Sequence, residues 1–302
     1  MTITEITKNY KGKIDQLDLE ILMAHSLGKT REFVLIHNDY EIPTVKIENL
    51  KFKISQRIKG EPIAYIIGHK EFYGLDFIVN KHTLVPRPET ELLVESAINE
   101  QRTRNNNHTC FVDIGTGSGC IITSIVSTME HGTWSMEQKK STRYYATDIS
   151  EEALEVAKKN AKLHGVDKKI KFLHGNLLSS FFTELNKLKA KKLMPEKLIL
   201  VANLPYLSKE IYQSAPIDVK KFEPKTALFS SEQGLAHYRK LLEQIKTLLI
   251  TDYQLPITIF LEISPEQKKL IIPVIRNIFP EARIEFQKDL AGKWRVCKIE
   301  IR

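Results

Sequence analysis

The chain has few cysteines and no long apolar run, and both shortages exclude whole classes of protein. Its three cysteines are Cys110, Cys120 and Cys297. They are too few and too scattered for a disulfide framework or a zinc site, so we interpret them as small core side chains in a reducing compartment. Apolar stretches such as 257–263 stop well short of the roughly 18 to 20 residues that a membrane span requires. The first residues lack a basic head followed by an apolar run, so no secretory signal is indicated, and we expect a cytoplasmic protein without membrane attachment.

The 302 residues are 42% hydrophobic and 27% charged, which suits one large or two modest globular domains. The net charge is 45 − 37 = +8. Most of it falls in the segment 158–197, where eleven lysines face only Asp167, Glu184 and Glu196. This segment predicts either a solvated surface or electrostatic contact with RNA or a ribosome. No aromatic residues interleave with its last lysines, which favours the solvated surface. The nine histidines show no paired ligand spacing, so we expect no bound metal.

Short helical patterns occupy the first part of the chain. Leu17 and Ile21, like Leu50 and Ile54, are four residues apart, a spacing typical of amphipathic helices. The pattern then changes to apolar residues around Gly74, which is typical of a hairpin. The predicted organisation is a helical domain at 1–70, a hairpin linker at 71–85 and a larger domain at 86–302.

Short apolar runs alternate with helical patterns beyond residue 86, which predicts an α/β fold with a parallel sheet covered by helices on both faces. The expected strands of this rhythm are 110–114, 144–147, 170–174, 198–202 and 257–263, and the expected helices are 121–129, 151–164 and 234–249. Two final strands, 283–287 and 295–301, follow each other with only a loop between them. This ending predicts an antiparallel strand at the edge of the sheet.

Three glycines follow the first of these strands directly and precede a helix. Glycine permits turns and close ligand approach that a Cβ would forbid. The third glycine comes two residues after the second, rather than the three of a dinucleotide fingerprint, which favours S-adenosylmethionine over NAD. A tight turn without a ligand is the alternative interpretation. The candidate cofactor-binding residues of this segment are Asp113, Gly115, Thr116, Gly117, Ser118 and Gly119.

Polar residues also follow the next two predicted strands. Asp148 can accept two hydrogen bonds from a ribose diol, as acidic residues do after the second strand of dinucleotide folds, although it could instead cap the following helix. Asn176 could hydrogen-bond an adenine edge while Leu177 packs on its face. As a lone loop asparagine, Asn176 would more often be a turn residue.

The loop Asn203-Leu204-Pro205-Tyr206 follows the fourth predicted strand, at the edge where open α/β sheets bind ligands. An asparagine side chain offers one acceptor and two donors, so it can grip a planar amide or amino group. The proline fixes the loop and the tyrosine ring can stack over the planar group. We predict that Asn203, Pro205 and Tyr206 are catalytic, that the whole loop binds substrate, and that Asn203 also contacts the cofactor.

Together these residues resemble the HemK/PrmC protein-(glutamine-N5) methyltransferases, over most of the chain. The resemblance also includes the segments Gly60–Gly68, Glu71–Gly74, Pro86–Glu91, Phe222–Leu228, Gly234-Leu235 and Asp289–Gly292. The family's target loop is usually Asn-Pro-Pro-Tyr, so Leu204 departs from it. Asn176 and Leu177 stand where the family commonly has an aspartate and an aromatic residue.

The resemblance implies a class I (Rossmann-like) methyltransferase domain, a helical N-terminal domain that helps to dock the protein substrate, and S-adenosylmethionine as methyl donor. The substrate it implies is the glutamine of a Gly-Gly-Gln tripeptide in peptide-chain release factors. An N6-adenine methyltransferase acting on DNA or RNA is the alternative, because the same loop can grip an exocyclic amine. A binding module that has lost activity, or a nicotinamide dehydrogenase, would fit fewer of these residues.

Overall fold

The computed structural model describes residues 1–104, 108–132, 134, 141–250 and 255–301, which form two compact units. One unit comprises Met1–His69 with Ala215–Phe222, and the other comprises Lys70–Ser214 with Glu223–Arg302. The sequence places Ala215–Phe222 in the larger domain, whereas the contacts group this segment with the N-terminal unit. The chain therefore returns to the first unit after leaving it, which local sequence patterns do not signal.

The N-terminal unit is helical. Its helices are α1 (Ile3–Tyr10), α2 (Gln16–Leu27), α3 (Arg31–Ile36), α4 (Thr44–Ile58), α5 (Ile63–Ile67) and the returning α12 (Ile217–Phe222). Leu50 and Ile54 of α4 are fully buried, as their spacing predicts. The helix expected from the spacing of Leu17 and Ile21 is present as α2, but Leu17 is 45% exposed and α2 buries Leu19 and Leu22 instead. Because α2 is apolar around much of its circumference, spacing alone could not identify its inward face.

The larger unit contains a two-stranded hairpin and a seven-stranded sheet. The hairpin is β1 (His69–Phe72) and β2 (Leu75–Ile78), and the sheet strands are β3 (Thr109–Ile114), β4 (Arg143–Asp148), β5 (Ile170–His174), β6 (Lys197–Ala202), β7 (Ile257–Glu262), β8 (Arg283–Lys288) and β9 (Trp294–Ile301). The accompanying helices are η1 (Pro88–Thr90), α6 (Glu91–Arg104), α7 (Cys120–His131), α9 (Glu151–Leu163), α10 (Ser179–Ala190), α11 (Lys209–Ser214), α13 (Lys225–Leu228), α14 (Ser231–Gly234), α15 (Ala236–Ile250) and α16 (Gln267–Ile278).

The strand order in the sheet is β5-β4-β3-β6-β7-β9-β8. Strands β3 to β7 pair in parallel, and β9 pairs antiparallel with both β7 and β8. The predicted parallel sheet with an antiparallel ending is confirmed, although β8 rather than the last strand forms the edge. The chain moves outward from β3 to one side and from β6 to the other. The carboxyl ends of β3 and β6 therefore flank the switch point where such sheets bind ligands.

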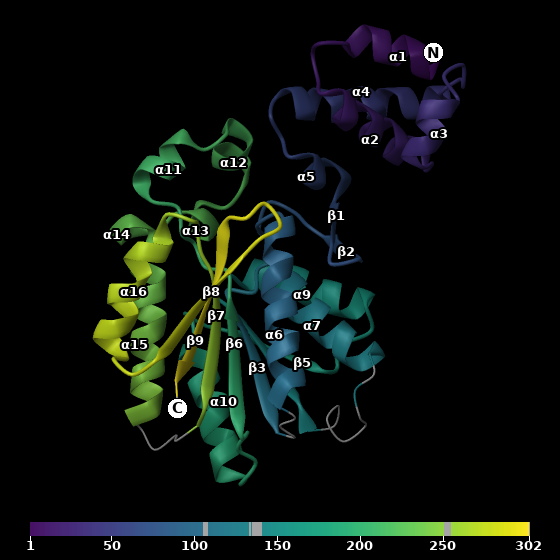
Figure 1. The fold of residues 1–302 in the computed structure, drawn as a ribbon. Helices are drawn as coiled ribbons and strands as arrows, with labels where there is room; N and C mark the ends of the chain where they lie inside the picture. The colour runs from purple at the N-terminus through teal and green to yellow at the C-terminus, as the bar shows by residue number, and fades with distance from the viewer. Residues whose placement is uncertain (105–107, 133, 135–140, 251–254, 302) are drawn as a thin grey trace. The chain divides into compact units, whose positions relative to one another are not determined.

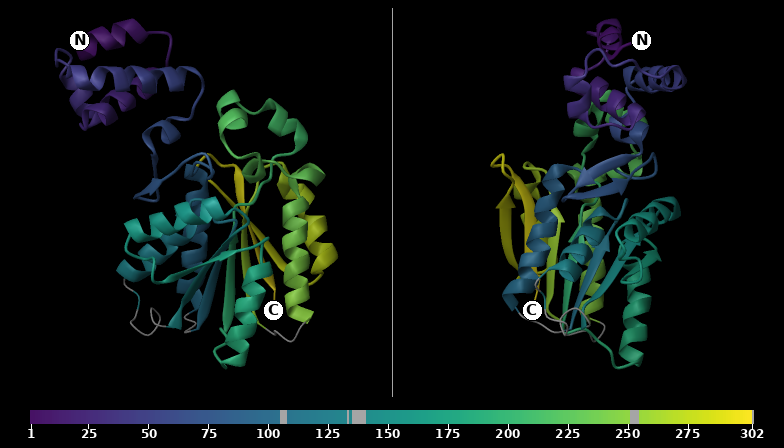
Figure 2. Two further views of the ribbon diagram at one scale, coloured as in Figure 1. Left: turned by 180° about the vertical axis from the view of Figure 1, so that it is seen from behind. Right: turned by 90° about the vertical axis from the view of Figure 1, so that its right-hand side faces the viewer.

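Helices cover both faces of this sheet (Figures 1 and 2). Alternate residues of β3 enter separate cores, because successive strand side chains point to opposite faces. Val112 packs with residues of α10, α15 and α16, whereas Phe111 packs with residues of α6, α7 and α9. This is the predicted layering of a class I methyltransferase fold.

We searched the described residues for membrane-spanning helices and for metal-binding groups. Among the helices of the described residues, none is long and apolar enough to cross a membrane. In the same ranges, no group of histidine, cysteine and acidic side chains is placed to hold a metal ion. All three cysteines are buried and free, as we interpreted them.

Candidate active site

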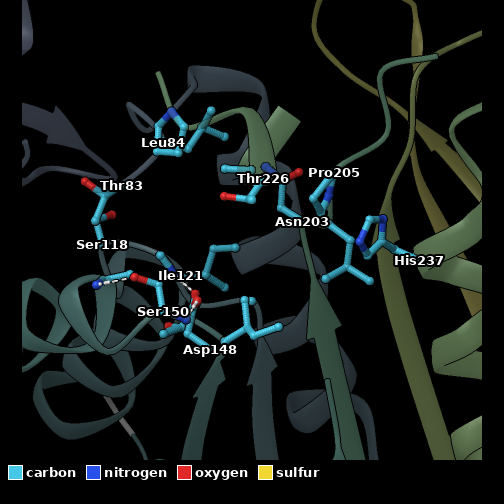
Figure 3. A pocket seen from close by; sticks show the side chains of 18 of the residues that line it. Thr83, Leu84, Ser118, Ile121, Asp148, Ser150, Asn203, Pro205, Thr226 and His237 are labelled. Atoms are coloured by element: carbon cyan, nitrogen blue, oxygen red, sulfur yellow. Dashed lines mark hydrogen bonds between the residues drawn. The ribbon is translucent and has the colours of Figure 1, made fainter. Parts of the chain in front are cut away.

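A cavity of about 370 Å³ opens at the carboxyl ends of β3, β4, β5 and β6. Its walls come from the segment 82–90, from the glycine loop after β3, from the loops after the next three strands, and from α13 and α15. Figure 3 shows Asn203 and Pro205 on one side of the cavity and Ser118, Asp148 and Ser150 on the other. The structure thus brings the predicted cofactor loop and the predicted target loop to one site.

Backbone hydrogen bonds fix the glycine loop above the sheet. The N–H groups of Gly115 and Thr116 both donate to the Thr147 carbonyl, at 2.8 and 3.0 Å. Gly117 has a φ of +56°, and a Cβ there would meet only the Gly115 oxygen, at 4.0 Å. Since Gly117 lines the cavity, that Cβ would occupy the space in which a ligand could approach the backbone.

Asp113 supports this loop from inside the protein. Its Oδ2 accepts hydrogen bonds from the Thr116 hydroxyl at 2.6 Å and from the Ile122 N–H at 3.3 Å. Burial raises the pKa of Asp113 to about 7, despite these two donors. Asp113 does not line the cavity, so its geometry is that of a support for the loop.

Asp148 lies at the cavity wall, where β4 ends. Its Oδ2 accepts from the Gly117 N–H at 2.8 Å, and its Oδ1 accepts from the Ser150 N–H at 2.9 Å. Burial raises the pKa of Asp148, while these backbone donors oppose the shift. Each carboxylate oxygen accepts up to two hydrogen bonds, so both retain capacity for a diol.

The loop after β5 is held by α15, which packs in the same core as this loop. Gln244 of α15 accepts from the Leu178 N–H at 2.9 Å and donates to the Asn176 carbonyl at 3.4 Å. Leu177 is held in the left-handed region, with a φ of +55°. Both Asn176 and Leu177 line the cavity, on the side that also contains Lys240.

Asn203 follows β6 directly, and its side-chain amide is oriented by a neighbour. The Nδ2 group donates to the Thr90 hydroxyl at 3.1 Å, which leaves Oδ1 as the acceptor. Leu204 is buried, and it packs so closely on the glycine loop that a Cβ on Gly115 would lie 3.0 Å from its Cδ2. The target loop and the glycine loop therefore touch.

Tyr206 points away from the position that we predicted for it. Its ring packs against the core between the sheet and α15, and burial raises the pKa of its hydroxyl. The side chain does not line the cavity. Instead, Gln267 donates to the Tyr206 carbonyl at 3.2 Å and to the Gly234 carbonyl at 3.0 Å, which fixes the end of the loop.

Most of the predicted site residues line the cavity together. They are Gly115, Thr116, Gly117, Ser118, Asp148, Asn176, Leu177, Asn203, Leu204 and Pro205. Asp113, Gly119 and Tyr206 lie behind this wall. A Cβ on Gly119 would lie 2.9 Å from the Ala157 Cβ, so the close approach at this glycine is made by α9 rather than by the cavity.

Sequence analysis missed the residues that hold the target loop. Thr90 is buried and belongs to the segment Pro86–Glu91, whose resemblance was noted without a role for this side chain. Glu262 ends the apolar run of β7, so an acid at the carboxyl end of a buried strand was an available signal. Arg87 and Glu223 form an ion pair that joins two segments of the resemblance, with Glu223 buried and Arg87 partly exposed.

The fold and the site define an α/β methyltransferase. Residues 105–259 match the model of a methyltransferase domain family, and residues 6–68 match that of the PrmC N-terminal domain family. The chain is 36% identical over 267 residues to a release factor glutamine methyltransferase of Enterococcus faecalis (strain ATCC 700802 / V583), covering 88% of this chain and 85% of that protein. It is 34% identical over 283 residues to one of Bacillus anthracis, covering 93% and 91%. The chain belongs to the family of release factor glutamine methyltransferases.

A solved structure shares the architecture at low identity. The hMettl16 catalytic domain in complex with MAT2A 3'UTR hairpin 6 superposes with a TM-score of 0.51 at 13% identity, over 91% of each chain. This likeness concerns the fold alone.

Proposed function

We propose that this chain transfers a methyl group from S-adenosylmethionine to the side-chain amide nitrogen of the glutamine in the Gly-Gly-Gln tripeptide of a peptide-chain release factor. The observation that carries the proposal is the Asn203 side chain, whose Nδ2 is fixed by Thr90 and whose Oδ1 is left to accept at the wall of the glycine-loop cavity. Family membership supports the same substrate.

The residues of the cavity suit the methyl donor. The open side of Gly117 admits a ligand against the backbone, and the Asp148 carboxylate can accept from the ribose hydroxyls. Asn176 and Leu177 would face the adenine. When bound, S-adenosylmethionine supplies an electrophilic methyl carbon, and the N–C bond forms as the C–S bond breaks and its electron pair returns to sulfur.

Positioning is the main task of the protein in this reaction. A carboxamide nitrogen is a poor nucleophile because its lone pair is delocalised into the carbonyl group. Asn203 Oδ1 and a backbone carbonyl of the target loop would accept the two N–H groups of the substrate amide, holding its nitrogen at a near-attack distance of roughly 3 to 3.5 Å. Accepting these hydrogens also stabilises the positive charge that develops on the nitrogen. The methylated nitrogen then loses a proton to water, so no general base is required.

The partner in this proposal is the release factor alone, in the cytoplasm where translation terminates. Contact with RNA or a ribosome through the segment 158–197 has less support, because carboxylates neutralise many of its lysines. The lysines of this segment that form ion pairs include Lys158, Lys169, Lys171, Lys187 and Lys197. Three of their partners, Glu155, Glu130 and Glu100, lie outside the segment, which is why its local charge count overstates the positive field.

A methylation assay tests the proposal. The protein is incubated with labelled S-adenosylmethionine and either a purified release factor or an adenine-containing oligonucleotide, and the modified residue is mapped by mass spectrometry. We expect label on the glutamine of the tripeptide and none on the oligonucleotide. Label on adenine without label on the release factor would contradict the proposal.

The variant Asn203→Ala separates the roles of this residue. We expect it to lower turnover by roughly 10³-fold, because orientation and transition-state hydrogen bonding are both lost. Binding of S-adenosylmethionine, measured by calorimetry, should stay within about threefold of wild type. An equal loss of binding and turnover would assign Asn203 to the cofactor instead.

A further inference from the structure

A buried carboxyl group lies behind the target loop. Glu262 is the last residue of β7 and is 1% exposed. In the register of β6 with β7, Ala202 pairs with Leu261, so Glu262 stands beside Asn203. Within the described part of the chain, the Oε2 atom of Glu262 has no hydrogen-bond partner.

Two hydroxyl groups lie near this carboxyl, one from η1 and one from the target loop. Thr90, which is 2% exposed, and Tyr206 lie close enough to Glu262 for hydrogen bonds from their hydroxyl groups to lower its pKa. The Thr90 oxygen also accepts from Asn203 Nδ2. A hydroxyl has a single hydrogen, so a Thr90 that donates to Glu262 can only accept from Asn203. Whether the Thr90 hydroxyl donates to Asn203 or accepts from it thus determines which atom of the Asn203 amide faces the cavity.

Charged and titratable groups surround Glu262 on several elements. Glu89 of η1 raises the pKa of Glu262, and Arg295 of β9 lowers it. Tyr238 of α15 donates to the Glu262 backbone carbonyl, and Cys120 of α7 lies within electrostatic range. Burial has the largest effect and raises the pKa of Glu262 to about 7.

We infer that Glu262 is a positioning residue for methyl transfer: its ionised carboxyl accepts from Thr90 and Tyr206, and Thr90 thereby holds Asn203 with Oδ1 toward the substrate amide. The inference rests on the proposed function. A protonated Glu262 is itself a donor, so Thr90 no longer has to donate to it. Its hydrogen can then turn to Asn203 Oδ1, and the substrate loses its oriented acceptor.

The first test replaces Glu262 by glutamine, which keeps the size and removes the titration. The turnover number is measured from pH 5.5 to 8.5 with saturating S-adenosylmethionine and release factor. We expect the wild-type turnover number to rise through pH ~7 and that of Glu262→Gln to be at least tenfold lower at pH 8 without that rise. Affinity for S-adenosylmethionine should change less than twofold. Glu89→Gln is the matched control, because it removes a neighbouring charge and should keep the rise. A Glu262→Gln variant with a wild-type profile would overturn the inference.

The second test concerns the relay through Thr90. Thr90→Val should lower turnover about as much as Glu262→Gln, the double variant should lose no more than the poorer single variant, and Thr90→Ser should restore activity. Additive losses in the double variant would show that the two residues act independently, against the inference.

A third measurement does not depend on catalysis. Infrared difference spectra against Glu262→Gln report the titration of this carboxyl, and Thr90→Val should raise its pKa by removing a donor to the ionised form. If wild type fails to methylate the release factor but this shift occurs, the proposed function fails while the coupling of Thr90 to Glu262 stands. An unshifted pKa in Thr90→Val would refute the coupling even in an active enzyme.

Discussion

Buried carboxyl groups at the two ends of the seven-stranded sheet have pKa values shifted in opposite directions. At the amino end, Glu100 contacts Lys197 and lies 2.8 Å from the ammonium group of Lys298, which also pairs with Glu300 at 2.7 Å. Burial raises the pKa of Glu100, but the hydrogen bonds and charges of the two lysines prevail and hold it at about 2. This carboxylate stays ionised throughout the physiological range.

At the carboxyl end, Asp113 and Glu262 are at least as deeply buried, and no cation of the described residues forms an ion pair with either of them. Each has one oxygen without a hydrogen-bond partner among the described residues. Burial raises both pKa values to about 7. An uncompensated buried acid costs stability, so the contrast indicates that this end of the sheet is arranged for chemistry and the amino end for stability.

Removing a cation from the amino end should have the largest effect. We expect Lys197→Met to lower the free energy of unfolding by about 3 to 5 kcal/mol, the range for breaking a buried ion pair. Denaturant unfolding at pH 7 measures this value. Lys158→Met is the matched control, since Lys158 pairs with Glu155 at 2.7 Å on an exposed helix face and should cost less than about 1 kcal/mol. Equal losses in both variants would remove the distinction between the two kinds of pair.

The carboxyl end relies on close backbone packing around the target loop. Gly234 has a φ of +86°, and a Cβ there would overlap the carbonyl oxygen of Tyr206. We expect Gly234→Ala to displace the target loop and to lower turnover about 100-fold, since small misplacements of catalytic groups cost this much. Gly165→Ala is the control: its φ is +68°, but no atom lies within 4 Å of the added Cβ. This control should retain activity, and a similar loss in both variants would point to backbone strain rather than to the loop.

The sequence alone was sufficient to predict the parts of the site that each lie on one continuous segment. The glycine loop, Asp148 and the target loop each follow a strand directly, so the strand pattern places them at one edge of the sheet. The meeting of Thr90, Glu262 and Arg295 could not be predicted, because it depends on the register of β6 with β7 and on the antiparallel insertion of β9. Such pairings are decided by packing between distant segments rather than by local pattern. The position of Tyr206 was misjudged for the same reason, since its partners come from α16 and β7.

The two ends should also differ in the sign of their pH dependence. A carboxyl whose pKa is raised on folding binds protons more tightly in the folded protein, so the free energy of unfolding falls as pH rises from about 4.5 to 7. Between pH 5 and pH 8, the free energy of unfolding of Glu262→Gln should therefore rise by about 2 kcal/mol relative to that of the wild type. Glu100, with its lowered pKa, contributes stability above pH ~4.5 that is lost as pH falls toward 2. The substitution Glu100→Gln should accordingly lower the free energy of unfolding, relative to the wild type, by less at pH 3 than at pH 7. Both expectations would be contradicted if the free energy of unfolding of each variant ran parallel to that of the wild type from pH 3 to pH 8.

The smallest expected effect concerns Arg295, the cation whose charge reaches Glu262 from β9. Its guanidinium group is held by Asp289, with contacts of 3.0 and 3.2 Å to one carboxylate oxygen. Arg295→Met removes a charge that favours the ionised carboxyl, so the rise of the turnover number with pH should move upward by about one pH unit. Arg283→Met removes an exposed charge that pairs with Glu285 on β8 and should leave the rise in place. An unmoved rise in Arg295→Met would mean that its charge is screened from Glu262, and the ionised form of Glu262 would then be stabilised by the Thr90 and Tyr206 hydroxyl groups without Arg295.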